Sequence, residues 1–223
     1  METKKSASQI TETLYRQYLE HLLAGNKKSC ITIINELLGR NIDIKDLYTN
    51  LFQRSMYEVG HLWESNQISI ATEHLATFST EGLLNLVYPV LFSTPRVGKK
   101  AVISCVKNGY HQVGGKMVAD IFELKGWDGY FLGANTPSRA LVQFIDEQKP
   151  RLVGLSISIL SNLVHLQHTL KILRTTFPNL DIILGGQAFR YGGMEVLEKF
   201  RNVVYIPSLT ELENLIIKKN NEG

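Results

Sequence analysis

The chain has 223 residues, of which 44% are hydrophobic and 20% charged, as in ordinary globular proteins. Its formal net charge of +3 is too small for the dense basic face of a nucleic-acid-binding protein, so no direct nucleic-acid partner is expected. No apolar run approaches the roughly 20 residues that cross a bilayer, and the N-terminus lacks the apolar core of a signal peptide. We therefore expect a cytoplasmic protein without a membrane partner.

Residues 1–92 are expected to form a four-helix bundle. Apolar residues recur at helical spacing in four amphipathic segments with short joints, which cover about 8–23, 27–38, 44–65 and 68–91. Ser8 or Thr11 can cap the first helix, Asp43 can cap the third, and Pro89 interrupts the fourth.

Beyond a Pro-, Gly- and Lys-containing linker over 93–100, the pattern changes. Short β-branched runs predict strands over 101–106, 128–133, 151–158, 181–186 and 202–206. Helical segments lie between and after them, over 112–125, 138–148, 161–177, 191–199 and 209–219. This alternation predicts a Rossmann-type, flavodoxin-like domain over 101–223, with a five-stranded parallel sheet.

The stretch 108-NGYHQVGG-115 lies where the first predicted strand is followed by a helix, at the sheet edge where ligands dock. It contains neither GxGxxG nor GxxxxGK[ST], so it does not indicate a phosphate site. Its histidine, His111, is a suitable ligand for a transition metal, but a single imidazole cannot hold a free ion tightly. A metal already held by a macrocycle would need only such an axial ligand. The alternative for His111 is an ordinary hydrogen-bonded loop residue.

Two other strand ends carry small or polar residues. Ser156 and Ser158 lie on one side of the third predicted strand, since alternate side chains share a face. Gly185 and Gly186 remove side chains at the end of the fourth strand. Together these positions predict a slot for a long ligand. The other histidines (His21, His165 and His168) belong to no such constellation and are assigned to structure or surface.

These stretches resemble the cobalamin-binding domains of the base-off, histidine-on type. The pattern of that family is Asp/Glu-x-His-x-x-Gly, then Ser-x-Leu or a variant, then Gly-Gly. The resemblance implies that His111 is the lower ligand of cobalt and that Gly114 admits the corrin and its nucleotide tail. It implies that the tail channel is lined by Ser156, Ser158, Gly185 and Gly186, and it extends the contacts to Gly109, Tyr110, Gln112, Val113 and Leu160.

The chain departs from this pattern at one position. The acidic residue that stands two before the histidine in the family is Gly109 here, so its hydrogen bond to the imidazole is missing. Loss of such a partner typically weakens metal binding about 10–100-fold.

The helical half adds a second match. Trp63, Glu73 and His74 reproduce a Trp-x9-Glu-His spacing, which resembles the helical caps of cobalamin-dependent light-sensing regulators. In that family these residues surround an adenosyl group on the upper face of the corrin. Met56, Val59 and Gly60 lie one or two helical turns before Trp63 and are expected to complete the apolar lid.

The resemblance implies a non-enzymatic light sensor that holds adenosylcobalamin between the helical cap and the Rossmann-like domain. Cap movement would then signal to a protein partner, such as a transcription factor or signalling domain. The oligomeric state, a homo-oligomer included, stays open.

Two alternatives remain. A corrinoid methyl carrier that serves a methyltransferase has a similar cap and sheet domain, but such carriers usually keep the acid that is Gly109 here. The second is a related photoreceptor whose altered pocket binds a bilin or another tetrapyrrole. No nucleophile with a paired base indicates catalysis by the chain itself.

Overall fold

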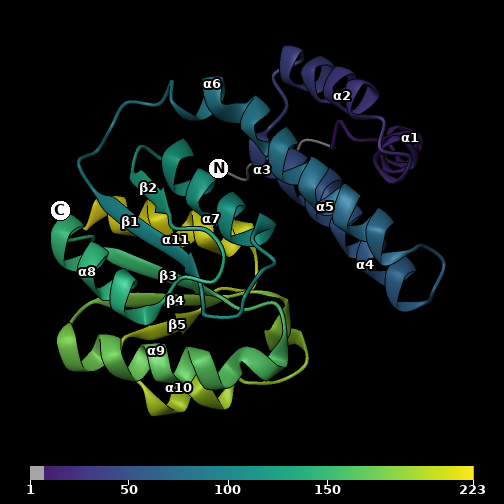
Figure 1. The fold of residues 1–223 in the computed structure, drawn as a ribbon. Coiled ribbons are helices and arrows are strands. Elements are labelled where there is room, and N and C mark those ends of the chain that lie inside the picture. Colours follow the sequence, from purple (N-terminus) through teal and green to yellow (C-terminus); the bar gives the residue numbers. More distant parts are fainter. Residues whose placement is uncertain (1–7, 223) are drawn as a thin grey trace. The chain divides into compact units, whose positions relative to one another are not determined.

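The computed structural model describes residues 8–222. The chain forms two compact units that divide between Pro89 and Val90. The first unit is helical and the second alternates strands with helices (Figure 1). Within the described range, no helix combines the length and the hydrophobicity that crossing a membrane requires.

The described residues up to Leu91 contain four helical stretches, as predicted. The first two are α1 (Glu12–Leu23) and α2 (Lys27–Gly39). The third is continuous and comprises α3 (Ile44–Asp46), the π-helical η1 (Leu47–Gln53) and α4 (Arg54–Glu64). The fourth comprises α5 (Ile70–Leu83), the 3₁₀ turn η2 (Leu84–Val87) and α6 (Tyr88–Leu91).

Polar side chains define where these stretches begin. Thr11 and Asn26 accept hydrogen bonds from main-chain N–H groups of α1 and α2, and Ser69 does the same for α5. The Asp43 carboxylate accepts two such bonds, at 2.7 and 3.3 Å, from the first turn of the third stretch. Each cap satisfies N–H groups that have no partner inside the helix. The prediction for Asp43 is confirmed, and Thr11 rather than Ser8 caps the first helix.

The fourth stretch leaves α-helical geometry earlier than predicted. The α-helix ends at Leu83, and η2 precedes Pro89. Proline lacks an N–H group, and its ring clashes with the carbonyl group four residues before it. The residues ahead of Pro89 therefore tighten into a 3₁₀ turn, so the effect of this proline reaches back over a full turn.

Aromatic side chains fill the centre of the helical unit. Tyr18, Tyr48 and Phe52 are fully buried. The Phe52 ring centroid lies 6.2 Å from that of Tyr18 and 6.0 Å from that of Tyr48. Burial of one such side chain stabilises the fold by about 1.5–3 kcal/mol. The same burial raises the pKa of Tyr18, because the phenolate would lose its hydration.

The second unit is built on five parallel strands in the order β2-β1-β3-β4-β5. The strands are β1 (Lys100–Cys105), β2 (Asp128–Phe131), β3 (Leu152–Ser156), β4 (Asp181–Gly185) and β5 (Val203–Tyr205). Between and after them lie α7 (Val113–Leu124), α8 (Ser138–Gln148), η3 (Leu160–Asn162), α9 (Leu163–Thr176), η4 (Gln187–Arg190), α10 (Glu195–Lys199) and α11 (Leu209–Asn221). The predicted flavodoxin-like α/β fold is confirmed.

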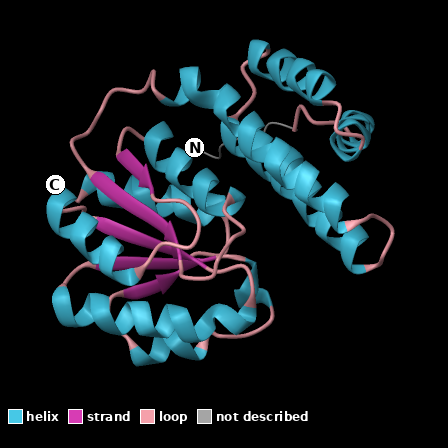
Figure 2. Ribbon diagram, in the orientation of Figure 1, coloured by secondary structure: helices cyan, strands magenta, loops and turns pink. Residues whose placement is uncertain are grey.

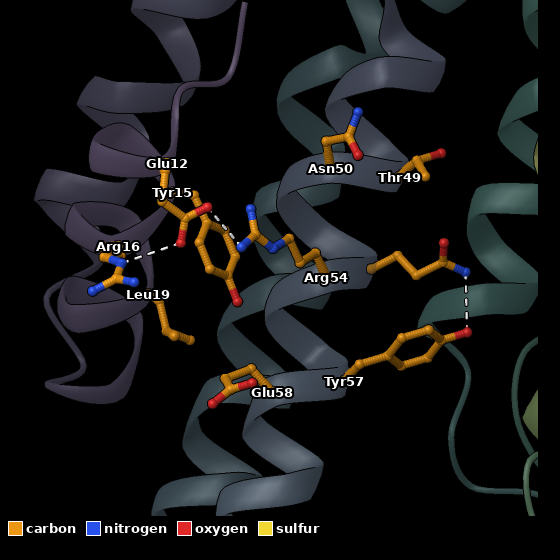
Figure 3. A pocket seen from close by; sticks show the side chains of 10 residues that line it. Glu12, Tyr15, Arg16, Leu19, Thr49, Asn50, Arg54, Tyr57 and Glu58 are labelled. Atoms are coloured by element: carbon orange, nitrogen blue, oxygen red, sulfur yellow. Dashed lines mark hydrogen bonds and ion pairs between the residues drawn. The ribbon is translucent and has the colours of Figure 1, made fainter. Parts of the chain in front are cut away.

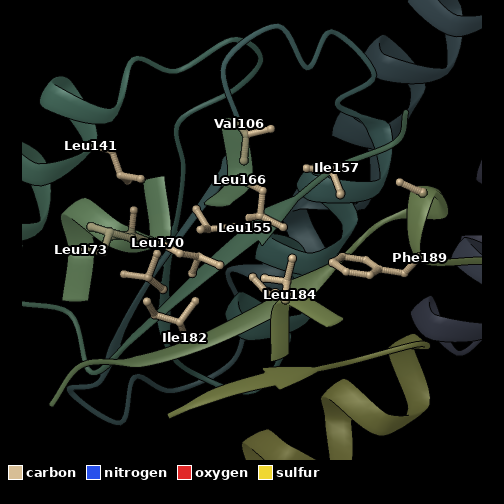
Figure 4. Packing of buried hydrophobic residues seen from close by; sticks show 14 of the residues in the cluster. Val106, Leu141, Leu155, Ile157, Leu166, Leu170, Leu173, Ile182, Leu184 and Phe189 are labelled. Carbon is tan, nitrogen blue, oxygen red and sulfur yellow. The ribbon is translucent and has the colours of Figure 1, made fainter. Parts of the chain in front are cut away.

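Helices flank the sheet on both sides (Figure 2). Alternate residues of the strands face opposite ways, and this separates two apolar layers. One layer packs β3 and β4 against α8 and α9 through residues such as Leu155, Leu166, Leu170 and Leu184, all at most 2% exposed (Figure 4). This packing fixes the sheet, and the loops at its carboxyl edge are therefore held by a rigid frame.

One predicted helix is shorter than expected. The segment 191–199 was predicted as a helix, but α10 begins only at Glu195 and a separate 3₁₀ turn, η4, precedes it. Gly192 and Gly193 have φ angles of 148° and 88°, which are incompatible with a right-handed helix. The two glycines therefore delay the start of the helix to Glu195.

Candidate cofactor-binding site

The strand order places a topological switch point beside the His111 loop. From β1 the chain passes to β2 on one side of it, whereas β3 pairs with its other side. The loops after β1 and β3 therefore leave the sheet in opposite directions, and in open α/β sheets ligands bind at such a switch point. The predicted ligand loops are those at this edge.

His111 lies in the loop between β1 and α7 and is exposed. The neighbouring Tyr110 is 66% exposed, whereas Val113 packs into the core with 9% exposure. The Cys105 thiol donates a weak hydrogen bond of 3.8 Å to the main-chain oxygen of His111. Gln112 extends towards the loop after β2, near Gly133. The imidazole is thus presented outward from a short, anchored loop.

A free metal ion would find few ligands in the described part of the chain. Among residues 8–222, no group of three or more His, Cys, Asp or Glu side chains converges in a geometry that could hold one. The His111 loop offers a single imidazole, which is what a macrocyclic metal complex with one vacant axial position needs.

Two adjacent glycines at the start of α7 differ in what surrounds them. A Cβ atom added at Gly115 would lie 2.9 Å from the Phe131 ring and 3.4 Å from the Cys105 sulfur, so internal packing explains this glycine. A Cβ atom at Gly114 would meet nothing within 4 Å. Because glycine destabilises a helix, the folded chain alone gives no reason for Gly114. An unobstructed surface beside His111 fits the close approach of a large flat ligand.

Ser156 is the last residue of β3, and Ser158 lies two residues beyond it. Ser156 and Ser158 are half-buried, and Ile157 between them is 1% exposed. The buried Ile157 thus separates two more accessible serines. Leu160, at the start of η3, is 38% exposed. This edge therefore presents two polar groups followed by an apolar one.

The two glycines at the carboxyl end of β4, one inside the strand and one directly after it, differ in their surroundings. Gly186 has a φ angle of 111°, and a Cβ atom there would lie 1.9 Å from the main-chain oxygen of Ile157. The fold itself requires glycine at this position, where the ends of β3 and β4 touch. At Gly185 a Cβ atom would make only an ordinary contact of 3.6 Å with the Ile206 oxygen. Gly185 is therefore the one that fits a ligand channel.

The residues predicted for the upper face lie on α4 and α5. Trp63 is 43% exposed. The Glu73 side chain is 14% exposed and the His74 side chain 72%, with 3.6 Å between Glu73 Oε2 and His74 Nε2. The Thr77 hydroxyl donates a 2.8 Å hydrogen bond to Glu73 Oε1. This bond orients the carboxylate along the surface of α5.

The register of α4 and α5 brings Trp63 and Glu73 to one level. The helices are joined by a short loop and run antiparallel, and the Thr80 hydroxyl donates to the Met56 sulfur at 3.3 Å. Trp63 lies seven residues after Met56, and Glu73 lies seven before Thr80. Two helical turns along each helix therefore place the two side chains opposite one another.

Met56 and Val59 are less accessible than a lid residue would be. Met56 is half-buried and contacts Thr80, and Val59 is fully buried in the helical unit. A Cβ atom added at Gly60 would meet nothing within 4 Å, although this residue lies in the middle of α4, where glycine is unfavourable. Of these three, Gly60 fits best beside a bulky ligand.

The helical unit also has an open groove of about 680 Å³ between α1 and the η1–α4 segment (Figure 3). The Arg54 guanidinium lies 3.6 Å from the Tyr15 ring centroid and 2.7 Å from Glu12 Oε2. Hydrogen bonds from Arg54 and Arg16 lower the pKa of Glu12, and burial raises the pKa of Tyr15. With 3.6 residues per turn, Arg54 and Trp63 face opposite sides of α4, whereas Tyr57 lies on nearly the same face as Gly60. The groove therefore lies on the side of α4 away from Trp63 and borders Gly60 at Tyr57.

Sequence reasoning missed a polar network around the His111 loop. Asn108 and Asn135 lie in the loops after β1 and β2, whereas Asn162 lies in η3 and His165 in α9. Hydrogen bonds join these four residues. The Asn-Gly pair at 108–109 is a turn signal, and Asn108 has the positive φ of 63° that such pairs favour. The long-range partners carry no local signal, because they meet only in the folded sheet.

Comparison with known families gives a match in each of the two units. A model of B12 binding domains matches residues 99–215, and a second model with the same description matches residues 14–88. Together they cover the sheet unit and the helical unit.

Among characterised proteins, the chain is similar to two transcriptional repressors of Myxococcus xanthus and to a corrinoid protein. It is 35% identical to HTH-type transcriptional repressor CarA over 91 residues, which are 40% of this chain and 31% of CarA. It is 28% identical to HTH-type transcriptional repressor CarH over 192 residues, which are 83% of this chain and 63% of CarH. Trimethylamine corrinoid protein of Methanosarcina barkeri is 23% identical over 137 residues, which are 60% of this chain and 63% of that protein. The chain thus spans less than two thirds of each.

The structure of Methanosarcina barkeri monomethylamine corrinoid protein is similar in fold. The TM-score is 0.80 at 13% identity, over 94% of this chain and 100% of that one. The family matches cover more than half of the chain and include every loop described above. The chain belongs to the B12-binding domain family and is a cobalamin-binding protein.

Proposed function

We propose that this protein is a light sensor that binds adenosylcobalamin with His111, in place of the cofactor's own base, as the lower ligand of cobalt. The observation that carries the proposal is the exposed imidazole of His111 beside the unobstructed Gly114, at the carboxyl end of β1. The match to CarH over 83% of this chain, at 28% identity, supports a sensor in particular.

On the lower side, the sheet unit would supply both the metal ligand and a channel. His111 would ligate cobalt, and Gly114 would let the corrin approach α7. The nucleotide tail would lie along the hydroxyl groups of Ser156 and Ser158 and past Gly185, where no side chain obstructs it.

On the upper side, the helical unit would supply the contacts to the adenosyl group. When bound, adenosylcobalamin supplies a light-labile cobalt–carbon bond. Trp63, Glu73 and His74 would contact the adenosyl group in the dark state only. Contacts made in only one of two states bias the helical unit between two conformations, and a protein partner such as a transcription factor or signalling domain would respond to that difference.

A corrinoid methyl carrier is the second candidate. It is supported by the 23% identity to trimethylamine corrinoid protein. Gly109 is unfavourable for this role, because repeated ligand exchange at cobalt benefits from an acid that hydrogen-bonds to the imidazole. A carrier would also bind a methyltransferase rather than respond to light.

The test is an absorption spectrum of the protein mixed with adenosylcobalamin in the dark, desalted, and then illuminated. We expect the cofactor to co-elute and its spectrum to change permanently with light. Co-elution without a stable light-driven change would favour the methyl carrier. Failure to co-elute would overturn both, and an absorption band far to the red would indicate a bilin.

Two variants separate the roles of the two faces. His111→Ala should abolish the histidine-ligated spectrum and weaken the binding of cobalamin, because the cobalt ligand itself is removed. Trp63→Ala should weaken adenosylcobalamin more than hydroxocobalamin, because only the former carries the bulky upper group. Equal loss for both cobalamins would place Trp63 outside the upper site.

A further inference from the structure

The two residues that precede Tyr110 and His111 are unusually well anchored. The main-chain N–H of Asn108 donates to Asn135 Oδ1 at 2.8 Å, and the main-chain oxygen of Asn108 accepts from Asn162 Nδ2 at 3.0 Å. The N–H of Gly109 donates to the Val106 oxygen at 2.8 Å, and its oxygen accepts from the N–H of Asn135 at 2.9 Å. All four main-chain polar groups of this dipeptide are therefore engaged.

The side chain of Asn108 extends this anchor to the helix after β3. Its Nδ2 atom lies 3.0 Å from Nε2 of His165, in the first turn of α9. With the amide nitrogen as the donor, the ring nitrogen is the acceptor of this bond. His165 is half-buried, and its main-chain oxygen accepts a 2.9 Å bond from Thr169, which fixes it in α9. The loop after β1 is thus tied to the helix after β3.

The loop cannot be braced by a side chain at position 109. A Cβ atom at Gly109 would lie 2.9 Å from the main-chain oxygen of Val106 and 3.5 Å from the Cβ atom of Cys105. Any larger residue would displace the turn that Gly109 forms. The support for the metal-ligating loop must therefore come from other elements, and the bonds to Asn108 are the ones the structure provides.

We propose that His165 is a positioning residue for His111, acting through Asn108. This inference rests on the proposed role of His111 as the cobalt ligand. The His165–Asn108 bond holds the left-handed turn at Asn108, whose φ is 63°, and so sets the direction in which the next two residues present the imidazole. Without it, the loop samples more orientations, and the fraction of molecules with His111 ready to ligate falls.

The first experiment measures the anchor in the ligand-free protein. Hydrogen exchange of the Asn108 and Gly109 amides should become faster, on the order of tenfold, in His165→Ala, while the sheet amides stay unchanged. His165→Gln should restore slow exchange, because the glutamine oxygen can accept the bond from Asn108. His168→Ala is the matched control, since His168 is exposed one turn along the same helix.

The second experiment measures the consequence for cobalamin. His165→Ala should lower the affinity for adenosylcobalamin on the order of tenfold and raise the fraction of bound cofactor whose spectrum lacks histidine ligation. His165→Gln should recover both, and His168→Ala should match the wild type. A merely structural role for His165 would change the melting temperature without changing the ligation spectrum.

The outcomes distinguish this inference from the function it rests on. If the wild-type protein binds cobalamin through His111 and His165→Ala binds it equally well with the same spectrum, the positioning role is wrong and the proposed function stands. If the wild-type protein binds no cobalamin, the proposed function fails. Unchanged exchange at Asn108 and Gly109 in His165→Ala would overturn the anchor whether or not cobalamin binds.

Discussion

At the scale of single residues, the two glycines that begin α7 separate what the fold needs from what a ligand needs. Gly114→Ala should stabilise the ligand-free protein by up to about 1 kcal/mol, because alanine is the better helix residue and the site is open. The same change should weaken cobalamin binding. Urea unfolding and a cobalamin titration measure the two effects.

Gly115→Ala is the matched control for that prediction. Its added methyl group would press on the Phe131 ring at 2.9 Å, so the variant should be destabilised by about 1–3 kcal/mol. Equal stability changes in the two variants would show that the surroundings of the glycines do not differ as described.

Cys30 is a second residue with a definite consequence. Burial raises the pKa of its thiol to about 11 from the ordinary 9.0. The folded state therefore favours the neutral thiol. The stabilisation that Cys30 provides is complete below about pH 9, where the thiol is neutral in both the folded and the unfolded chain, and it is lost as the pH rises towards 11. The difference in free energy of unfolding between the wild type and Cys30→Ala should shrink over this range. A difference that stays constant with pH would contradict the raised pKa.

At the scale of elements, the third helical stretch depends on its first residue. Asp43→Ala removes both hydrogen bonds to the first turn and should lower the free energy of unfolding by about 1 kcal/mol. Asp43→Asn keeps an acceptor oxygen and should lose much less. Thermal unfolding of the three proteins checks the order, and equal losses would indicate that charge rather than capping is responsible.

The elements also show which features a sequence can predict. Helices and strands were predictable because apolar spacing and caps such as Thr11 and Asp43 are local. The π-helical geometry of η1 was not, because it leaves the apolar pattern of residues 47–53 almost unchanged. The early end of α5 was missed because the influence of Pro89 acts backwards along the chain.

The candidate site was predictable in part for the same reason. His111 and the two Gly-Gly pairs lie in short local motifs, whereas the bond between Asn108 and His165 joins residues 57 apart in sequence. The burial of Val59 could not be read from its spacing either, because one helical face can pack against a neighbour or face a ligand. What surrounds a side chain depends on contacts with residues distant in sequence, and local sequence patterns carry no information about those contacts.

At the scale of the whole molecule, the two compact units are expected to unfold separately in the ligand-free protein. The chain has two tryptophans, Trp63 in the helical unit and the fully buried Trp127 in the sheet unit. In Trp63→Phe, urea unfolding followed by fluorescence reports only the sheet unit, whereas circular dichroism reports both. The two transitions should not coincide. Coincident transitions would show that the units form one cooperative structure.

The close contact between Gly186 and Ile157 has a consequence for the history of this chain. Descendants that lose the cofactor would still need glycine at 186, since the backbone there admits no other residue without strain, whereas position 185 would be released to drift. In related sequences, glycine at position 186 would then indicate that the fold is kept, whereas glycine at position 185 would indicate that the cofactor is still bound. Relatives that keep glycine at position 186 but not at position 185 would be expected to retain the sheet and to have lost cofactor binding.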